Sequence, residues 1–343
     1  MTRDGAPRPI LLPANQPTDR PYRGGRGIAR FRGCPHTGEY TPEDFVASTT
    51  EVYAGGGVGL TRLADGRTLA AAIRDDPVGY LGDEHVQRYG PDPRLLVKLL
   101  DTAERLFVHF HPDDDFARQH LGRVSGKTEA WYVLGTEGDA AVWLGFREDV
   151  PPADVERWYR QQDAPAMLAA MHRLDVAPGD SVFVPAGTPH ALGPGITLVE
   201  LQQPEDLSIL LEYRGYRGLT AAQATLGLPT DLAWTALNRT GWTAPQVRRL
   251  VRQRATNGSV FPPAADRYFR AERHRIDGVR RFEPGYELIV VLAGAGVLAT
   301  DAGAVSVAEG ATVLVPYGSG DRELSGHLTV LRCRPPRRPA ATG

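Results

Sequence analysis

The chain of 343 residues contains little cysteine and no excess of charge of either sign. Its two cysteines, Cys34 and Cys333, are isolated and in no CxxC pair, so we expect free thiols rather than a disulfide framework. The 39 basic and 41 acidic residues give a net charge of −2, which favours neither nucleic acid nor an anionic membrane as a partner. No apolar run approaches the length of a membrane span or a secretory signal, so we expect a cytoplasmic protein.

Glycine and proline are abundant instead. The 38 glycines and 28 prolines make up about a fifth of the chain and separate short apolar runs, a pattern typical of strands joined by tight turns. The runs at 58–63, 95–100, 131–134 and 140–145 are predicted strands of a barrel. A chain of this length can bury two cores. The sequence therefore predicts an all-β dominated fold.

Helices are predicted at few places. One segment at 154–162 and another at 164–171 are helical in pattern, with Asp163 as the cap of the second. Two short helices are predicted at 230–237 and 243–251, the latter opened by a capping box of Thr243 and Gln246. Several arginines follow that box, but no aromatic residues are interleaved, which favours a solvated helix face over a nucleic-acid surface.

Histidines and a glutamate in the first half have the pattern of a metal site. His109 and His111 are two positions apart in an apolar stretch, so both point to one face of a strand. Glu129 follows, and His190 ends a Gly-x5-Pro-x-Gly-x2-His segment with the spacing of the second cupin motif. A single such histidine is usually a core or surface residue. The combination instead predicts one divalent metal bound by His109, His111, Glu129 and His190.

Three blocks around these residues resemble class I mannose-6-phosphate isomerases, which are zinc-dependent cupins. They read HFHPDD from His109, GKTEAWY around Glu129 and PAGTPHAL around His190, in the family's order and relative spacing. The lysine-bearing run LLVKLLD, a Gly-Gly pair at 24–25 and the segment 43–48 also resemble family blocks. The resemblance runs from about 21 to about 206. It implies aldose–ketose isomerisation of mannose 6-phosphate and fructose 6-phosphate through an enediol.

Two departures bear on the metal and the substrate. The family usually has glutamine where this chain has His109, and a third imidazole widens the choice of metal from Zn²⁺ toward Fe²⁺, Mn²⁺ or Ni²⁺. The family's active-site arginine is replaced by Leu210. Arg214 and Arg217 follow, and parity along a strand keeps Arg214 on the face of Leu210, although roughly 13 Å away at about 3.3 Å per residue. Either arginine is a candidate substitute for binding substrate.

Other candidate site residues are polar groups near the predicted ligands. Lys127 precedes Glu129 by two positions and faces the same way on an extended segment. Lys98 lies in an apolar strand, where an ammonium either transfers protons with a lowered pKa or stays charged and binds a phosphate or hydroxyl. Lys98 snorkelling from a strand edge is the plainer alternative. The resemblance also makes Ser48 a candidate for binding substrate.

The last third repeats the cupin spacing without the ligands. The segment from Gly310 to Asp321 matches the one that ends at His190, but Asp321 stands in place of the histidine and no His-x-His precedes it. We therefore expect a metal-free second barrel, in which His274 and His327 have local roles. The expected division is a metal-binding cupin domain at 1–218 with a Pro-rich N-terminal arm, a helical linker at 219–260 and a metal-free cupin domain at 261–343.

The function predicted from these residues is that of a metal-dependent isomerase of a sugar phosphate. An iron-dependent cupin oxygenase stays open, because four protein ligands leave two positions on an octahedral ion. A metal-containing sugar-binding protein without catalytic activity also stays open, because Leu210 replaces the arginine. The sequence indicates no oligomeric state.

Overall fold

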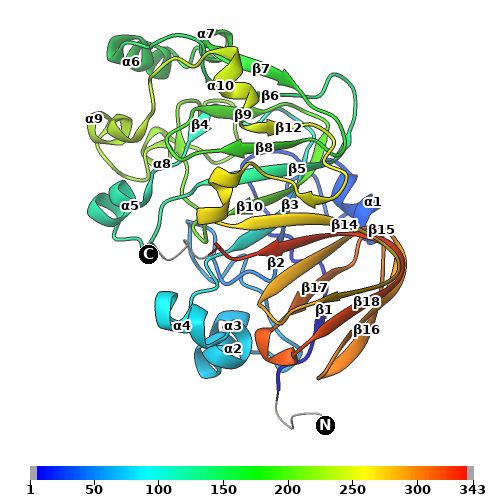
Figure 1. The fold of residues 1–343 in the computed structure, drawn as a ribbon. Helices are drawn as coiled ribbons and strands as arrows, with labels where there is room; N and C mark the ends of the chain where they lie inside the picture. The colour runs from blue at the N-terminus through cyan, green and yellow to red at the C-terminus, as the bar shows by residue number, and fades with distance from the viewer. Residues whose placement is uncertain (1–5, 338–343) are drawn as a thin grey trace, which may run out of the picture.

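The computed structural model describes residues 6–337. Residues 1–5 of the expected arm and 338–343 of the expected C-terminal domain lie outside the described residues. Three antiparallel sheets dominate the structure (Figure 1), which confirms the prediction of an all-β dominated fold. No helix in the described range is both long and apolar enough to cross a bilayer.

Two of the sheets face each other and form the first barrel. The six-stranded sheet has the order β12-β8-β5-β10-β3-β2, with β2 (Glu43–Val46), β3 (Leu96–Thr102), β5 (Glu129–Thr136), β8 (Ser181–Val184), β10 (Ile196–Gln202) and β12 (Val251–Arg252). The five-stranded sheet has the order β11-β4-β9-β6-β7, with β4 (His109–Phe110), β6 (Ala141–Phe146), β7 (Met171–Asp175), β9 (His190–Leu192) and β11 (Ile209–Leu210).

The inner face of the six-stranded sheet is apolar at one end and polar at the other. At one end it is apolar, because alternation places Leu100, Val133 and Leu198 together, and these residues belong to the core shared with the facing sheet. At the other end the same alternation places Lys98 opposite Glu200 and Glu129 opposite Gln202. The polar residues of this face are therefore gathered at one end of the barrel, beside a packed apolar core.

Helices cover the outer face of the five-stranded sheet and contribute to a second core with residues such as Phe110, Phe146 and Ile209. These helices are α5 (Asp114–Leu121), α6 (Pro152–Gln161), α7 (Ala164–Ala170) and α9 (Thr230–Ala233), with α8 (Ala221–Ala224), η1 (Trp234–Ala236) and α10 (Ala244–Arg248) nearby in the chain. Asp163 caps α7 as expected, and Thr243 with Gln246 forms the expected capping box of α10.

The third sheet contains the C-terminal strands and curls around its own small core. Its strands are β1 (Ile10–Leu12), β13 (Gly258–Ser259), β14 (Arg270–Phe282), β15 (Glu287–Thr300), β16 (Gly303–Ala308), β17 (Thr312–Val315) and β18 (Arg322–Arg334). Its other face packs against the outer face of the six-stranded sheet, where Leu99 and Val199 share a core with Val290 and Leu331. The arm strand β1 pairs with β17, so the beginning of the chain completes the C-terminal sheet.

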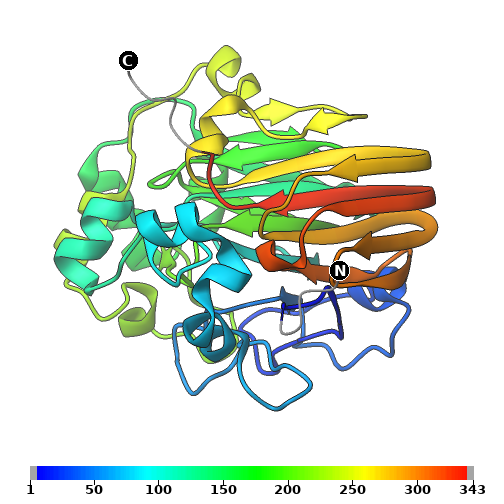
Figure 2. The same cartoon turned by 60° about the horizontal axis from the view of Figure 1, so that its bottom comes forward.

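Two local features differ from the expectations. The predicted strand at 58–63 is wrong, because the segment begins in a turn at Gly59, whose φ is 91°, and only an isolated bridge at Arg62 follows. Three short helices that the sequence pattern did not reveal follow it: α2 (Leu69–Asp75), α3 (Pro77–Leu81) and α4 (Asp83–Tyr89). Figure 2 shows these helices in cyan, to the left of the red and orange C-terminal strands. The helix α1 (Gly27–Arg32) and the 3₁₀-helices η2 (Pro263–Arg267) and η3 (Tyr317–Ser319) complete the described elements.

Candidate metal centre

Three buried imidazoles meet at the polar end of the first barrel. His109 on β4 and His190 on β9 are direct partners in the register, with ring centroids 4.0 Å apart. His111 follows β4, and its ring centroid lies 5.0 Å from that of His109 and 4.9 Å from that of His190. One nitrogen from each ring lies within 4.8 Å of the others. The side chains expected to bind a metal through nitrogen are therefore brought together.

Each of the three rings is held by a backbone carbonyl. Nδ1 of His109 donates to the carbonyl of Phe107 at 3.0 Å. Nδ1 of His111 donates to the carbonyl of Leu207 at 2.6 Å, and Nδ1 of His190 donates to the carbonyl of Thr188 at 2.8 Å. Because a carbonyl oxygen only accepts, Nδ1 carries the hydrogen in each ring and Nε2 keeps its lone pair. This tautomer is the one in which Nε2 can bind a metal.

Glu129 on β5 faces the same nitrogens. Its carboxylate oxygens lie 3.1 Å from Nε2 of His111 and 3.2 Å from Nε2 of His190. An Nε2 atom without a hydrogen cannot donate to a carboxylate, so both nitrogens and one Glu129 oxygen are buried without a hydrogen-bond partner. Buried polar atoms without partners are costly. A divalent ion bound by three imidazoles and one carboxylate fits this arrangement.

Two glycines bring the segments of the site together. Gly187 has φ of 80° and donates its N–H to the carbonyl of His111, so the corner before His190 is fixed against the end of β4. At Gly126, a Cβ would lie 2.3 Å from the carbonyl oxygen of Pro112, and the next N–H, of Lys127, donates to that same oxygen. Only glycine permits this close approach, which carries the chain into β5 and Glu129.

Both predicted lysines are buried in this end of the barrel. Lys127 Nζ lies 3.2 Å from Glu129. Lys98 Nζ lies 3.1 Å from Asp206 and 3.4 Å from Glu43, and it stands over the ring of Phe45 at 4.6 Å. Burial opposes the charged form, but Asp206 and Glu43 outweigh it and raise the pKa of Lys98. Lys98 is therefore a fixed cation, which favours binding over proton transfer.

Glu200 was not singled out from the sequence, although it belongs to the same group. It lies on β10 opposite Lys98, and its carboxylate lies 3.9 Å from Lys98 Nζ. Burial and the neighbouring Glu129 carboxylate raise the pKa of Glu200 to about 8. Period-two alternation with Gln202 and Leu198 was the available signal, because it places Glu200 on the inner face of the barrel.

Buried charges surround this group on the side of the N-terminal arm. Arg20 pairs with Glu43 and lies 3.6 Å from Asp206, so both carboxylates are shared between Arg20 and Lys98. Despite burial, the neighbouring cations keep the pKa of Glu43 and of Asp206 below their usual values. Arg20 belongs to the N-terminal arm, whose proline-rich composition does not predict a position beside the candidate metal centre.

The other predicted substrate residues lie outside this group. The hydroxyl of Ser48 donates to the carbonyl of Thr50 within its own loop. Arg214 is exposed, and Arg217 is half exposed, with its guanidinium 3.0 Å from Asp19 and over the ring of Tyr40. Neither arginine replaces the family arginine in this conformation. Leu210 is buried in the barrel core and pairs directly with His109 across β11 and β4.

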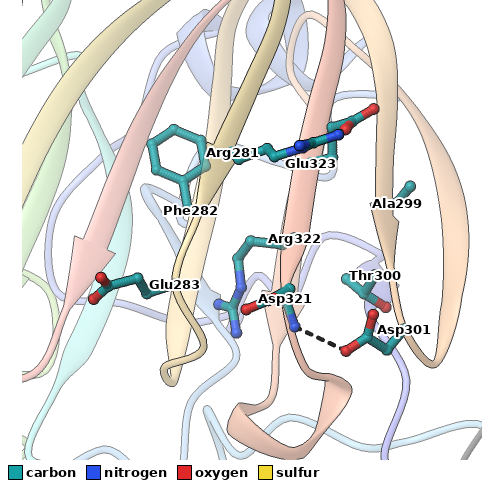
Figure 3. Close-up of a pocket in the computed structure, with 9 residues that line it drawn as sticks. All are labelled: Arg281, Phe282, Glu283, Ala299, Thr300, Asp301, Asp321, Arg322 and Glu323. Atoms are coloured by element: carbon teal, nitrogen blue, oxygen red, sulfur yellow. Dashed lines mark hydrogen bonds and ion pairs between the residues drawn. The ribbon is translucent and has the colours of Figure 1, made fainter.

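The corresponding end of the second barrel has a different lining. A cavity of about 560 Å³ opens there, and Figure 3 shows Asp321 with its backbone N–H directed at the Asp301 carboxylate, 3.1 Å away. Arg322 beside it is buried and paired with Glu287 at 3.0 Å. No histidine lines this cavity in the described range. The expectation of a metal-free second barrel stays a prediction.

Known proteins resemble this chain in sequence and in structure. No protein-family model matches the chain. The probable mannose-6-phosphate isomerase GmuF of Bacillus subtilis (strain 168) is 36% identical to this chain over 137 residues. The match covers 39% of this chain and 41% of GmuF, so the chain matches less than half of the length of that relative. Mannose-6-phosphate isomerase ManA of the same strain is 26% identical over 236 residues, 68% of this chain and 72% of ManA.

Solved structures match over nearly the whole chain. The mannose 6-phosphate isomerase of Bacillus subtilis has a TM-score of 0.67 at 20% identity, covering 96% of this chain and all of that one. This likeness shows the fold. The chain is therefore similar in sequence to mannose-6-phosphate isomerases and has the fold of a solved one, and its three histidines meet in space as the three blocks predicted.

Proposed function

We propose that the chain is a metal-dependent aldose–ketose isomerase of a sugar phosphate, with mannose 6-phosphate and fructose 6-phosphate as the substrate pair. The observation that carries the proposal is the group of buried Nε2 atoms of His111 and His190, which face Glu129 without hydrogen-bond partners. Charged side chains suited to holding sugar oxygens lie next to it. Relatives named for this activity support the assignment.

The metal that we propose is a single Zn²⁺, held by His109, His111, Glu129 and His190. Three imidazoles with one carboxylate also suit Fe²⁺, Mn²⁺ or Ni²⁺. When bound, the ion would polarise the sugar carbonyl and stabilise negative charge on the oxygens of carbons 1 and 2. The backbone carbonyls behind each ring would keep the imidazoles oriented.

The remaining residues would bind the sugar and move its proton. Lys98 stays charged and can hold a hydroxyl or phosphate oxygen, and Lys127 can donate to an oxygen next to Glu129. Glu200 is placed between them on the inner face, so its carboxyl group is our candidate to move the proton between carbon 2 and carbon 1. The packed apolar core behind this end of the barrel would limit water access.

The direct test is interconversion of mannose 6-phosphate and fructose 6-phosphate by the purified, metal-loaded chain in D₂O. An enediol route puts solvent deuterium on carbon 1 or 2, which NMR detects. Glu200→Gln should keep the metal and the fold yet lose both turnover and deuterium incorporation. Glu309→Gln, a change at an exposed glutamate of the second barrel, is the matched control.

The same preparation separates the alternatives. Oxygen consumption with an iron-loaded chain and no ketose formation would indicate an oxygenase. Binding of sugars with neither reaction would indicate a protein without catalytic activity. Either result overturns the isomerase proposal.

A further inference from the structure

A second groove, of about 810 Å³, opens between helices α3 and α4 and the C-terminal sheet. Its volume is within the range of about 300–1,000 Å³ typical of small-molecule sites. Six arginines line it, against three carboxylates (Asp83, Glu84 and Glu283): Arg88, Arg270, Arg281, Arg332, Arg334 and Arg337. The lining therefore holds more guanidinium groups than carboxylates, and Arg281, Arg332, Arg334 and Arg337 each have a carboxylate partner from outside it.

Two of these arginines are direct neighbours across the sheet. Arg270 on β14 and Arg334 on β18 are partners in the register, and like charges directly opposite each other destabilise a sheet. Glu272 compensates Arg334 and Arg332. Nε of Arg270 donates to the carbonyl of Pro335 instead. Burial and the charge of Arg334 lower the pKa of Arg270 to about 10. An anion bound between the two arginines would relieve this repulsion.

The walls of the groove add aromatic surface on one side. Tyr317 is 42% exposed and its ring lies against Gly82, where a Cβ would be 2.8 Å from it. Tyr89 lines the same wall. On the other side, the groove adjoins the cavity of Figure 3, whose lining includes the carboxylates of Asp301, Asp321 and Glu323. These acidic groups would repel an anion and confine its charged end to the arginines.

We propose that this groove is a second ligand site, separate from the metal centre, that binds a nucleotide with its phosphates between Arg270 and Arg334 and its base against Tyr317. Guanidinium groups are suited to phosphate oxygens because they donate in pairs. An exposed tyrosine ring offers a stacking surface that a simple phosphate would not use.

Calorimetric titration of the full chain at low salt with ATP, inorganic tripolyphosphate and adenosine tests this proposal. We expect ATP to bind more tightly than tripolyphosphate and adenosine to bind weakly. Arg270→Gln and Arg337→Gln should each weaken ATP binding at least tenfold, and Tyr317→Ala should bring ATP to the level of tripolyphosphate. Arg249→Gln, at an exposed arginine after α10, is the matched control and should change nothing.

Thermal unfolding without ligand adds a second readout. Without ligand, Arg270→Gln should unfold at the same or a higher temperature than the wild type, because the change removes a repulsive neighbour of Arg334. With ATP present, the wild type should unfold at the higher temperature. The proposal is overturned if ATP does not bind, if Arg249→Gln weakens it as much as Arg270→Gln, or if tripolyphosphate binds as tightly as ATP. These outcomes do not depend on isomerase activity.

Discussion

Leu210 lies directly opposite His109 across the pairing of β11 and β4. Direct cross-strand partners project from the same face of a sheet, so this leucine is a neighbour of the candidate metal centre. It stands where the family has an arginine, and the exposed Arg214 and Arg217 do not take its place. The polar end of the barrel consequently has one fixed cation fewer than the family pattern implies.

Introducing that cation should improve recognition of a phosphorylated sugar. We expect Leu210→Arg to raise kcat/KM for mannose 6-phosphate at least about tenfold, because guanidinium–phosphate pairs form strong paired hydrogen bonds. Leu210→Met is the control, since it keeps the volume without charge. Steady-state kinetics on mannose 6-phosphate and on unphosphorylated aldoses measure the effect. A wild-type kcat/KM of about 10⁴ M⁻¹s⁻¹ or more for mannose 6-phosphate would show that the arginine is dispensable.

Removing one imidazole should remove the metal. We expect His190→Ala or His111→Ala to lose most of the bound ion, because three remaining groups bind it far less tightly. Elemental mass spectrometry of the purified protein measures this. His36→Ala, at an exposed histidine, should keep full occupancy. Full stoichiometric metal in His190→Ala would contradict the proposed ligand set.

One metal per chain is the expected stoichiometry. Asp321 is exposed at the mouth of the second barrel, and His274 is engaged with Glu272 at 3.3 Å, so neither is part of a group like that of the first barrel. Anomalous diffraction from crystals of the metal-loaded protein should show one peak. A second peak at Asp321 or His274 would refute the prediction.

Loss of the buried Lys98 should destabilise the protein. Lys98→Met leaves Arg20 as the remaining ion-pair partner of Glu43 and Asp206 among the described residues, and breaking a buried ion pair typically costs about 3–5 kcal/mol. Urea unfolding at pH 7 measures the difference. Arg30→Ala, which removes an exposed pair with Glu137, should have little effect. Similar small changes in the free energy of unfolding for both variants would mean that Lys98 does not stabilise the fold.

The stabilising effect of Glu272 should depend on pH. A hydrogen bond from His274, with Arg334 and Arg332 nearby, lowers the pKa of Glu272 to about 2, below the value of about 4.3 in an unfolded chain. Its contribution is therefore complete above about pH 5 and is lost as the pH falls toward 2. We expect Glu272→Gln to cost about 1–3 kcal/mol at pH 6 and much less at pH 3, measured by urea unfolding. An equal cost at both pH values would contradict this.

Features that depend on local spacing could be predicted from the sequence. Two-residue periodicity placed His109 and His111 on one face, and a Pro/Gly corner defined the segment that ends at His190. Capping chemistry located α7 and α10, because a cap forms between residues three positions apart. Local rules failed at 58–63, where glycines with positive φ turn an apolar run into a series of turns.

Contacts between residues far apart in the chain could not be predicted in this way. The register of β10 with β3 and β5 brings Glu200 to Lys98 and the candidate ligands, and the arm adds Arg20 from the far end of the chain. The pairing of Arg270 with Arg334 is equally invisible in the sequence, since 63 intervening residues separate them. Such contacts arise from strand register and from sheet packing, which depend on the burial of the whole core rather than on any local pattern of residues.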